Sequence, residues 1–354
     1  MTYAIENIPC SKEEYEKRKK EIFASYETIQ AAKDRFEELK KKALRKYAFQ
    51  TKCVNARGDY LFNCHDGKLL FDVRNAKNCA YMADAEDPID CWDGNNMYSK
   101  PELCLDLMGI LESSRTKHST YILYSSGVEY SDNCQNCESC FGCIGLRKTQ
   151  YCILNTAYTK EEYERLKSEI IAAMQREGVY GDFLPPFLSP FGYSETLAND
   201  YFQLSRDAIL AKGFNVHDAA GGTFGKETIP KGSMPQTIQE APEAMVNEIL
   251  VCETCGKNFR IVAAELDFYR SLNLPLPRKD FACRHKARME QRTPRTLWCR
   301  ACACAGNASE GGAYKNTGMH IHGTTHCPRE FETSYALNRP EIVYCEACYN
   351  AEVA

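Results

Sequence analysis

The chain has 354 residues, of which 44% are hydrophobic and 26% charged, with a formal net charge of -4. This composition is ordinary for a folded protein of two or three domains and excludes global disorder, and the mild charge excludes a protein that coats nucleic acid over its whole surface. No run approaches the roughly 18 apolar residues of a membrane helix. The first residues are charged and lack an apolar signal core, so we expect a cytoplasmic protein without membrane contact.

Twenty cysteines in one chain require an explanation. Because cytosolic thiols stay reduced, we do not expect a disulfide framework. Two uses of cysteine remain, namely ligation of a metal ion and burial as a small hydrophobic side chain.

The N-terminal region, residues 1–46, is predicted to form a helix over residues 11–46. Ser11 and Glu14 match a capping box, in which each side chain satisfies an otherwise unpaired backbone N–H. The segment is rich in Lys and Glu, and its apolar residues recur at intervals of three, four and seven. This pattern indicates a solvated helix with one packed stripe.

The start of this helix is repeated later in the chain. Residues 11–26 (SKEEYEKRKKEIFASY) and 159–174 (TKEEYERLKSEIIAAM) share nine of sixteen residues, and Thr159 with Glu162 repeats the capping box. The approach is also alike, with Ile5-x-Asn7 against Ile153-x-Asn155. We infer a duplicated unit whose first copy is truncated.

Residues 47–157 are predicted to form a cysteine-rich β-solenoid-like domain. From Cys53 to Cys104 the cysteines recur at intervals of 11, 15, 12 and 13 residues, several directly after Asn or Asp, and short aromatic or β-branched runs alternate with turn residues. We interpret the runs as short strands stacked in coils, with cysteines filling a narrow interior and Asn or Asp at the corners. The gap from Cys104 to Cys134 interrupts this rhythm.

A run of four cysteines at three-residue spacing permits three interpretations: an iron–sulfur cluster, an additional zinc site, or packing inside the solenoid. The run consists of Cys134, Cys137, Cys140 and Cys143. The usual bacterial iron–sulfur run spaces its last pair by three residues, continues with Pro and is paired with a second run. Here Ile144 follows and no second run exists, which favours packing and leaves these cysteines as possible metal ligands.

Residues 158–245 are predicted to be a helical connector and linker. The aromatic and Pro-rich stretch around residues 183–202 is typical of an irregular path across a neighbouring domain. Ser205 caps a short helix that Gly213 ends. Residues 219–242, rich in Gly, Thr and Pro, are expected to form a linker.

The last region, residues 246–354, is predicted to be a double zinc-binding module. Its first site begins with Cys252-x-x-Cys255-Gly256, the shape of a zinc knuckle, in which the turn aims two thiolates at one ion and Gly relieves backbone strain. Cys283 supplies the third ligand. The fourth is His285 or Asp280, and His285 is preferred because imidazole is the commoner structural ligand.

The second site combines Cys327 with the pair Cys345 and Cys348, in a stretch that has the form of a zinc-ribbon hairpin. A partner is missing three residues before Cys327, where Thr324 stands. Cys302 or Cys304, returning across a Gly-rich loop, is the natural replacement.

Three histidines near this site, His320, His322 and His326, are either metal ligands or part of a surface loop. A catalytic zinc would keep one position open for water. The second site offers more ligands than one ion needs, so a closed, structural site is favoured. The chain contains none of the HExxH, HxE…CxxC or GxSxG patterns of zinc proteases, deaminases or serine hydrolases.

An excess of basic residues lies between residues 278 and 300. Arg284, Arg288 and Arg292 recur at helical spacing, which suits contacts to phosphates of a nucleic acid. The alternative, a solvated or acid-paired helix face, is favoured on general grounds.

Several segments resemble a known family. YCILNTAYTKEEYERL, LSPFGYSETLANDYF, NLPLP and CPREFETSY…RPEIVYCEACY look like uncharacterised cysteine-rich zinc-ribbon proteins of small-genome bacteria and giant viruses, over most of residues 130–354. The resemblance implies a cysteine-patterned repeat region followed by zinc knuckles, without an established activity. Some members carry a CoA-transferase name, which this chain does not support, and where this chain has Asp280 its relatives often have Cys.

The sequence therefore predicts an α+β, multi-domain protein that binds zinc, two ions per chain. We expect a non-enzymatic scaffold whose zinc module contacts nucleic acid, ribonucleoprotein or protein, with no small-molecule substrate identified. The alternative is a metal-dependent redox or hydrolytic enzyme that uses the Cys134–Cys143 cluster or the His320–Cys327 loop.

Overall fold

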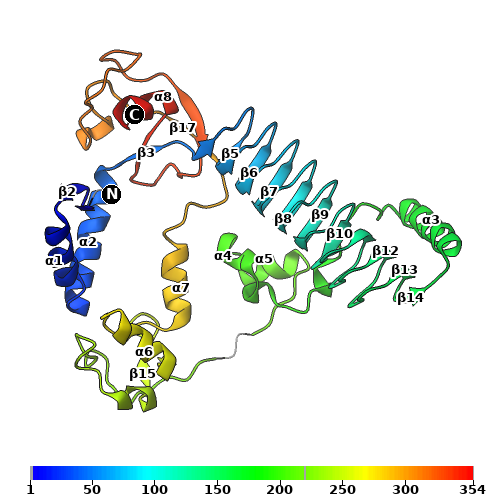
Figure 1. Ribbon diagram of the computed structural model, residues 1–354, viewed down its shortest axis with the longest axis horizontal. Coiled ribbons are helices and arrows are strands. Elements are labelled where there is room, and N and C mark those ends of the chain that lie inside the picture. The colour runs from blue at the N-terminus through cyan, green and yellow to red at the C-terminus, as the bar shows by residue number, and fades with distance from the viewer. Residues whose placement is uncertain (1–2, 219–220, 354) are drawn as a thin grey trace.

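The computed structural model describes residues 3–218 and 221–353. It consists of a β-solenoid, two cysteine-rich modules, and helices that join them (Figure 1). The α+β solenoid architecture predicted from the sequence is confirmed. None of the helices in the described residues is long and apolar enough to cross a membrane.

The solenoid is a single sheet of eleven short strands stacked in chain order, from β4 to β14. Neighbouring strands are parallel except at the last pair, β13 and β14. The strands are β4 (Gln50–Thr51), β5 (Gly58–Phe62), β6 (Lys68–Arg74), β7 (Ala80–Ala85), β8 (Trp92–Tyr98), β9 (Leu105–Leu111), β10 (Lys117–Thr120), β11 (Ser126–Glu129), β12 (Glu138–Phe141), β13 (Gln150–Ile153) and β14 (Thr156–Ala157).

Each coil spans about twelve residues, and every third residue points into the interior. The residue before nearly every inward position has a positive φ, as at Asn133 (51°) and Asn136 (54°) before Cys134 and Cys137. Asn and Asp tolerate this left-handed conformation better than other residues with a Cβ. The frequent Asn-Cys and Asp-Cys pairs are therefore corners followed by an inward side chain, as the sequence predicted.

The gap between Cys104 and Cys134 does not interrupt the solenoid, because serine and threonine occupy the inward positions there. Ser113, Thr116, Ser119, Ser125 and Ser131 are all buried. The interval of 15 residues between Cys64 and Cys79 is one coil of twelve residues plus the three residues to the next inward position. Ala76 occupies the position one coil after Cys64, and Cys79 is the inward residue that follows it. Leu, Met, Ile, Val and Ala are the other residues of this buried core.

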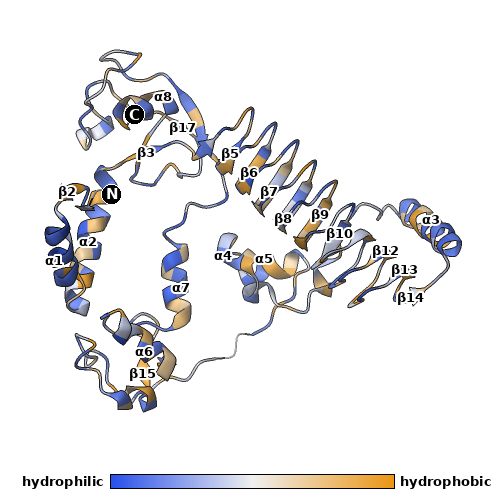
Figure 2. Ribbon diagram, in the orientation of Figure 1, coloured by the Kyte–Doolittle hydropathy of each residue, from blue (hydrophilic) through white to orange (hydrophobic). Residues whose placement is uncertain are grey.

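The duplicated unit has the same local structure in both copies. β13 and β14 form an antiparallel hairpin that leads into α3 (Lys160–Glu177), and β1 (Tyr3–Ile5) and β2 (Ile8–Cys10) form one that leads into α1 (Lys12–Ile22). The rings of Tyr151 and Tyr163 lie 5.8 Å apart, and those of Tyr3 and Tyr15 lie 5.4 Å apart. α3 packs on the last coil, whereas α1 is mostly hydrophilic and buries no residue (Figure 2).

The predicted single helix over residues 11–46 is wrong, because it is divided into two helices and a strand. α1 ends at Ile22, and Ser25 starts α2 (Tyr26–Lys42) with a capping box in which Thr28 is the second partner. This second cap competes with continuation of α1. β3 (Leu44–Lys46) follows and pairs in parallel with β19 (Ile342–Tyr344).

The connector contains the short 3-10 helices η1 (Pro186–Leu188) and η2 (Tyr193–Glu195), then α4 (Leu197–Tyr201) and α5 (Arg206–Ala211), with Ser205 as its cap. The first two residues of the predicted linker 219–242 lie outside the described residues. The rest is only partly a linker, because Met234, Ile238 and Ala241 are buried in the core of the first module.

The two cysteine-rich modules lie at opposite ends of α2 (Figure 1). Module one begins at η3 (Glu243–Asn247), and Tyr26 at the start of α2 packs against its Arg278. Module two pairs its strand β19 with β3, just beyond the end of α2. Module one contains β15 (Leu250–Val251), β16 (Asn258–Phe259), α6 (Ala263–Ser271) and α7 (Phe281–Met289); module two contains β17 (Trp298–Ala301), η4 (Glu310–Gly312), β18 (Glu330–Thr333), β19 and α8 (Glu346–Val353).

Module two also covers the first coil of the solenoid. Ser334 donates a hydrogen bond to the buried carboxylate of Asp59, Arg57 forms an ion pair with Glu332, and Thr333 donates to the carbonyl of Tyr47. An open solenoid end would expose unpaired backbone groups to other chains. The module therefore acts as a cap on the N-terminal end of the solenoid.

Candidate metal centres

The first centre groups Cys252, Cys255, Asp280 and Cys283, whose ligand atoms all lie within 4.8 Å of one another. The β15–β16 turn supplies the first two, and Gly256 with a φ of 76° lets its backbone close on the carbonyl of Cys252. Asp280 is the N-cap of α7: its Oδ1 accepts the backbone N–H of Cys283 at 2.7 Å, and its Oδ2 lies 3.0 Å from the Cys255 Sγ. One carboxylate thus caps the helix and faces the metal position.

His285 does not join this group, contrary to the preference stated from the sequence. Its Nε2 lies 2.9 Å from Asp200 Oδ2, on α4 of the connector. Residues two positions apart on a helix point in different directions, so His285 faces away when Cys283 faces the knuckle. Asp280 at the N-cap projects toward the knuckle and takes the fourth position.

The second centre groups Cys302, Cys327, Cys345 and Cys348, all buried and again within 4.8 Å of one another. A tetrahedral zinc ion with Zn–S bonds of about 2.3 Å requires sulfurs about 3.8 Å apart, and the Sγ atoms of Cys327 and Cys345 lie 3.9 Å apart. The backbone N–H of Cys345 points at the Cys302 Sγ at 3.2 Å. Four sulfurs in this geometry can close the shell of one zinc ion.

The sequence left the fourth cysteine of this centre open between Cys302 and Cys304, and the structure places Cys302 there. Among the described residues β18 and β19 do not pair with each other as the expected hairpin would: β18 pairs with β17, and β19 pairs with β3 from the N-terminal region. Antiparallel pairing of β17 with β18 carries Cys302 to Cys327, since the N–H of Cys302 bonds the carbonyl of Arg329. The distant partner of β19 left no local signal in the sequence.

Cys304 belongs to a third group together with His320, His322 and Cys348. His320 is buried and His322 half-buried, so the two are not part of an open surface loop. His326 lies apart, with its Nε2 3.0 Å from the exposed Glu310. Of the three histidines that the sequence offered as possible ligands, the structure brings His320 and His322 to the cysteines, whereas His326 stays outside the group.

The four cysteines of the 134–143 run are the four inward residues of one solenoid coil. They are buried, and their thiols donate to carbonyls two residues earlier, as Cys137 does to Gln135 at 3.3 Å. Ser113 and Ser125 make the same bond at equivalent positions. Within the described residues these cysteines do not form one of the groups with ligand atoms close enough to share an ion.

Within each cysteine centre the thiol pKa values shift in both directions: against the desolvation of burial, backbone N–H donors and neighbouring thiols lower the pKa of Cys252 and of Cys345. Desolvation raises the pKa of Cys302 to about 12, and desolvation with neighbouring thiols raises that of Cys283 to about 12. Zinc binds thiolates, so binding must displace these protons.

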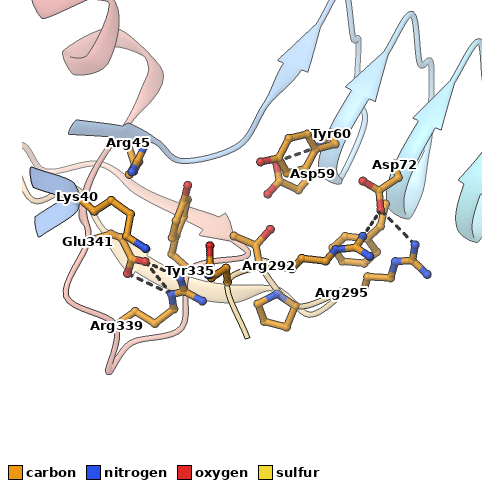
Figure 3. Close-up of a pocket in the computed structure, with 14 residues that line it drawn as sticks. Lys40, Arg45, Asp59, Tyr60, Asp72, Arg292, Arg295, Tyr335, Arg339 and Glu341 are labelled. Atoms are coloured by element: carbon orange, nitrogen blue, oxygen red, sulfur yellow. Dashed lines mark hydrogen bonds and ion pairs between the residues drawn. The ribbon is translucent and has the colours of Figure 1, made fainter. Parts of the chain in front are cut away.

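The arginines predicted to contact phosphates are mostly paired within the chain. Arg284 Nη1 lies 3.1 Å from Glu265, and Arg292 donates to the hydroxyl of Tyr201 at 2.6 Å and approaches Asp72. Arg288 is exposed. Figure 3 shows Arg292 and Arg295 directed at Asp72, at one end of a cavity of about 380 Å³ between the first coils, the loop after α7 and module two.

Arg295, a further arginine of the same basic stretch, is also paired within the chain. Its side chain is 6% exposed, bonds Asp72 and Asp84 at solenoid corners, and lies 4.0 Å from the ring centre of Tyr201. These contacts attach the segment after α7 to the solenoid. The aspartates lie far away in the sequence, so charge spacing alone could not reveal the pairing.

Searches against protein-family models and against curated proteins found no match for this chain.

Proposed function

We propose that this protein is a non-enzymatic, zinc-stabilised scaffold that binds another protein on its solenoid. The observation that carries the proposal is the placement of the second centre: its module closes the first coil through Ser334, Glu332 and Thr333. Zinc in that module would hold the cap in shape, because small metal modules draw much of their folding free energy from the ion.

The ligand sets support a structural role for the metal. Cysteine-rich sets of four are typical of structural zinc and leave no position for water. The first centre offers three sulfurs and one carboxylate oxygen, and the second offers four sulfurs. Each set is complete for a tetrahedral ion, whereas a catalytic ion would keep a position open.

Charge pairing favours a protein over a nucleic acid as the partner. Arg284 and Arg292, which lie at the spacing of a phosphate-binding face, are held by Glu265, Tyr201 and Asp72. A cation already paired with a carboxylate releases few counterions on contact with phosphate, so it contributes little to nucleic-acid affinity.

The solenoid offers a surface of the right character for a protein. Exposed apolar side chains gather around Trp92, which is 43% exposed, lies 6.4 Å from the ring of Tyr81 and pairs in register with Leu105; Leu103, 61% exposed, is two residues before Leu105. Leu103 also lines a groove of about 580 Å³ between the solenoid and α3. The groove contains lysines and arginine together with Glu129, Glu138 and Glu164. An apolar patch beside mixed charge suits a protein, while the carboxylates would repel a phosphate backbone.

The test uses the full chain in its native cells, with chemical crosslinking and mass spectrometry. We expect one set of partner proteins to be crosslinked to the wild type and lost from the Trp92→Ser/Leu105→Ser variant. Tyr121→Ser, at another corner of the solenoid and 51% exposed, is the matched control and should retain those partners.

Circular dichroism checks that the variants keep the fold. Crosslinks to RNA or DNA in place of protein, or partners that persist in the patch variant, would contradict this function. Elemental mass spectrometry of the purified wild type should find zinc, and its absence would remove the structural basis of the proposal.

A further inference from the structure

Module two contains more metal ligands than its four-cysteine centre uses. Cys304, His320 and His322 lie with Cys348 in a group whose ligand atoms are all within 4.8 Å of one another. Cys348 is therefore common to this group and to the four-cysteine centre. The two groups lie side by side and meet at one sulfur.

One sulfur–nitrogen distance in the group equals that of a tetrahedral zinc ion, and a second is slightly shorter. With Zn–S bonds of about 2.3 Å and Zn–N bonds of about 2.0–2.1 Å, sulfur and nitrogen ligands should lie about 3.6 Å apart. The Cys304 Sγ and the His320 Nδ1 lie 3.6 Å apart, and the His322 Nε2 lies 3.2 Å from the Cys348 Sγ.

Both histidines are oriented as metal ligands usually are. The second ring nitrogen of each meets an acceptor: His320 Nε2 lies 2.7 Å from Glu352 Oε1, and His322 Nδ1 lies 2.8 Å from the carbonyl of Thr325. An acceptor at that nitrogen holds its proton there and leaves the lone pair of the other nitrogen facing the cysteines. Carboxylate and carbonyl partners of this kind are the common outer contacts of zinc-bound histidines.

The loop that carries the histidines is fixed to α8. The Glu352 carboxylate is fully buried and accepts the backbone N–H groups of Thr317 and Gly318, at 2.9 and 3.0 Å. Gly318 lies so close to α8 that a Cβ there would be 2.1 Å from the carbonyl oxygen of Ala351. Asn316 adds an N–H donor to the Cys304 Sγ at 3.2 Å. The ligands are thus held in place from outside the group.

We propose that module two binds a pair of zinc ions bridged by the Cys348 thiolate. One ion takes Cys302, Cys327 and Cys345, the other takes Cys304, His320 and His322, and the shared sulfur completes both tetrahedra. Seven side chains thereby supply the eight positions of two closed shells. This inference rests on zinc occupancy of the four-cysteine centre in the proposed function and adds a third ion to the chain.

A pair of ions explains why histidine and glutamate side chains are buried beside Cys304. A single ion in the four-cysteine centre gives no reason for burying His320 and Glu352 beside Cys304. Sulfur with imidazole is a donor set typical of zinc, and each thiol binds as thiolate with release of its proton. With both shells closed, the pair is structural and stabilises the solenoid cap.

The experiment measures zinc per chain in the full-length protein by elemental mass spectrometry. We expect three ions in the wild type, and the loss of at least one in the His320→Gln/His322→Gln variant. Gln keeps an N–H donor for Glu352, which protects the fold. His326→Gln, on the same loop but paired with exposed Glu310, is the control and should retain three.

A second measurement tests the bridge without any substitution. When Co(II) replaces zinc in the wild type, exchange through a shared thiolate should couple two of the ions and suppress their electron paramagnetic resonance signal. Three magnetically independent Co(II) ions would overturn the bridge. If the wild type and the histidine variant both contain two zinc ions, the third ion is refuted and the proposed function stands. If the wild type contains no zinc, both proposals are refuted.

Discussion

The Oγ of Ser125 lies 3.0 Å from the backbone nitrogen of Cys137, one coil further along the solenoid. The same hydroxyl donates to the carbonyl of Leu123 at 2.7 Å. Ser113, Ser119 and Ser131 accept N–H groups of the next coil in the same way, and Cys79 and Cys143 do so at 3.5 Å. Serine and cysteine thus do more than fill a narrow interior, because each accepts an inward-facing N–H.

Ser125→Ala should destabilise the coils around it by about 1–3 kcal/mol, because it leaves the buried N–H of Cys137 without an acceptor. Ser125→Cys should cost less, since cysteine makes both bonds elsewhere in the solenoid. Native-state hydrogen exchange of amides in β11 and β12 measures the difference. Equal protection in the two variants would show that packing alone sets the stability of this position.

The run of four cysteines should contribute to folding and not to metal content. Cys137→Ser keeps a donor to the carbonyl of Gln135 and places at this position the residue that Ser125 provides one coil earlier. We expect zinc and iron content equal to the wild type, and a loss of stability of at most about 1–2 kcal/mol. Elemental mass spectrometry decides the point: loss of a whole equivalent of either metal would restore the cluster interpretation.

The repeated features of this chain could be predicted from sequence, and the contacts between distant segments could not. Asn133-Cys134 and Asn136-Cys137 revealed the corner and inward positions, because local backbone preference and side-chain size act within a few residues. Ser125 and its neighbours were missed because only cysteine was treated as the interior residue. The pairing of β19 with β3, and of Arg295 with Asp84, depends on segments hundreds of residues apart.

At the first centre, the sequence left the fourth ligand open between His285 and Asp280, and the preference for imidazole selected His285. A carboxylate at an N-cap can serve both the helix and a metal, which a count of common zinc ligands does not reveal. In the structure Asp280 completes the group with Cys252, Cys255 and Cys283, and His285 does not join it.

Asp280→Asn should weaken zinc binding at the first centre while it keeps the helix cap, because Asn is as good an N-cap as Asp but lacks the charge. We expect loss of about one zinc equivalent after dialysis. His285→Gln should retain all the zinc and alter only the contact with Asp200. Loss of zinc in the His285 variant with retention in the Asp280 variant would reverse the ligand assignment.

Chelators should remove the metal of module one before that of module two. Cys255 is exposed and Cys283 half-buried, whereas all four cysteines of the second centre are buried. Exchange of a bound ion requires access of a competing ligand, so the exposed centre should open first. A time course with EDTA, followed by release of zinc to a colorimetric dye, should show a fast phase that Cys255→Ser abolishes. A single phase unaffected by that variant would contradict the order.

Arg295 should be the main electrostatic link between the segment after α7 and the solenoid. Its guanidinium is buried against Tyr201 and shared by Asp72 and Asp84, whose side chains remain 32% and 29% exposed. Partial exposure of the carboxylates reduces the penalty for leaving them unpaired, so the coupling in a cycle of Arg295→Gln and Asp84→Asn should be about 1–2 kcal/mol.

The coupling is measured by hydrogen exchange of the amides in β6 and β7, the strands that carry Asp72 and Asp84. Arg288→Gln, an exposed arginine of the same basic segment, is the control and should leave exchange unchanged.

If the basic segment instead contacts phosphates, the variant with Arg284, Arg288 and Arg292 all replaced by Gln should bind RNA or DNA with a weaker dependence on salt. The slope of the logarithm of the binding constant against the logarithm of salt concentration should flatten by about two to three units. We expect no such binding at micromolar protein in low salt, because Arg284 and Arg292 already have intramolecular partners; binding with that slope would refute their assignment to the fold.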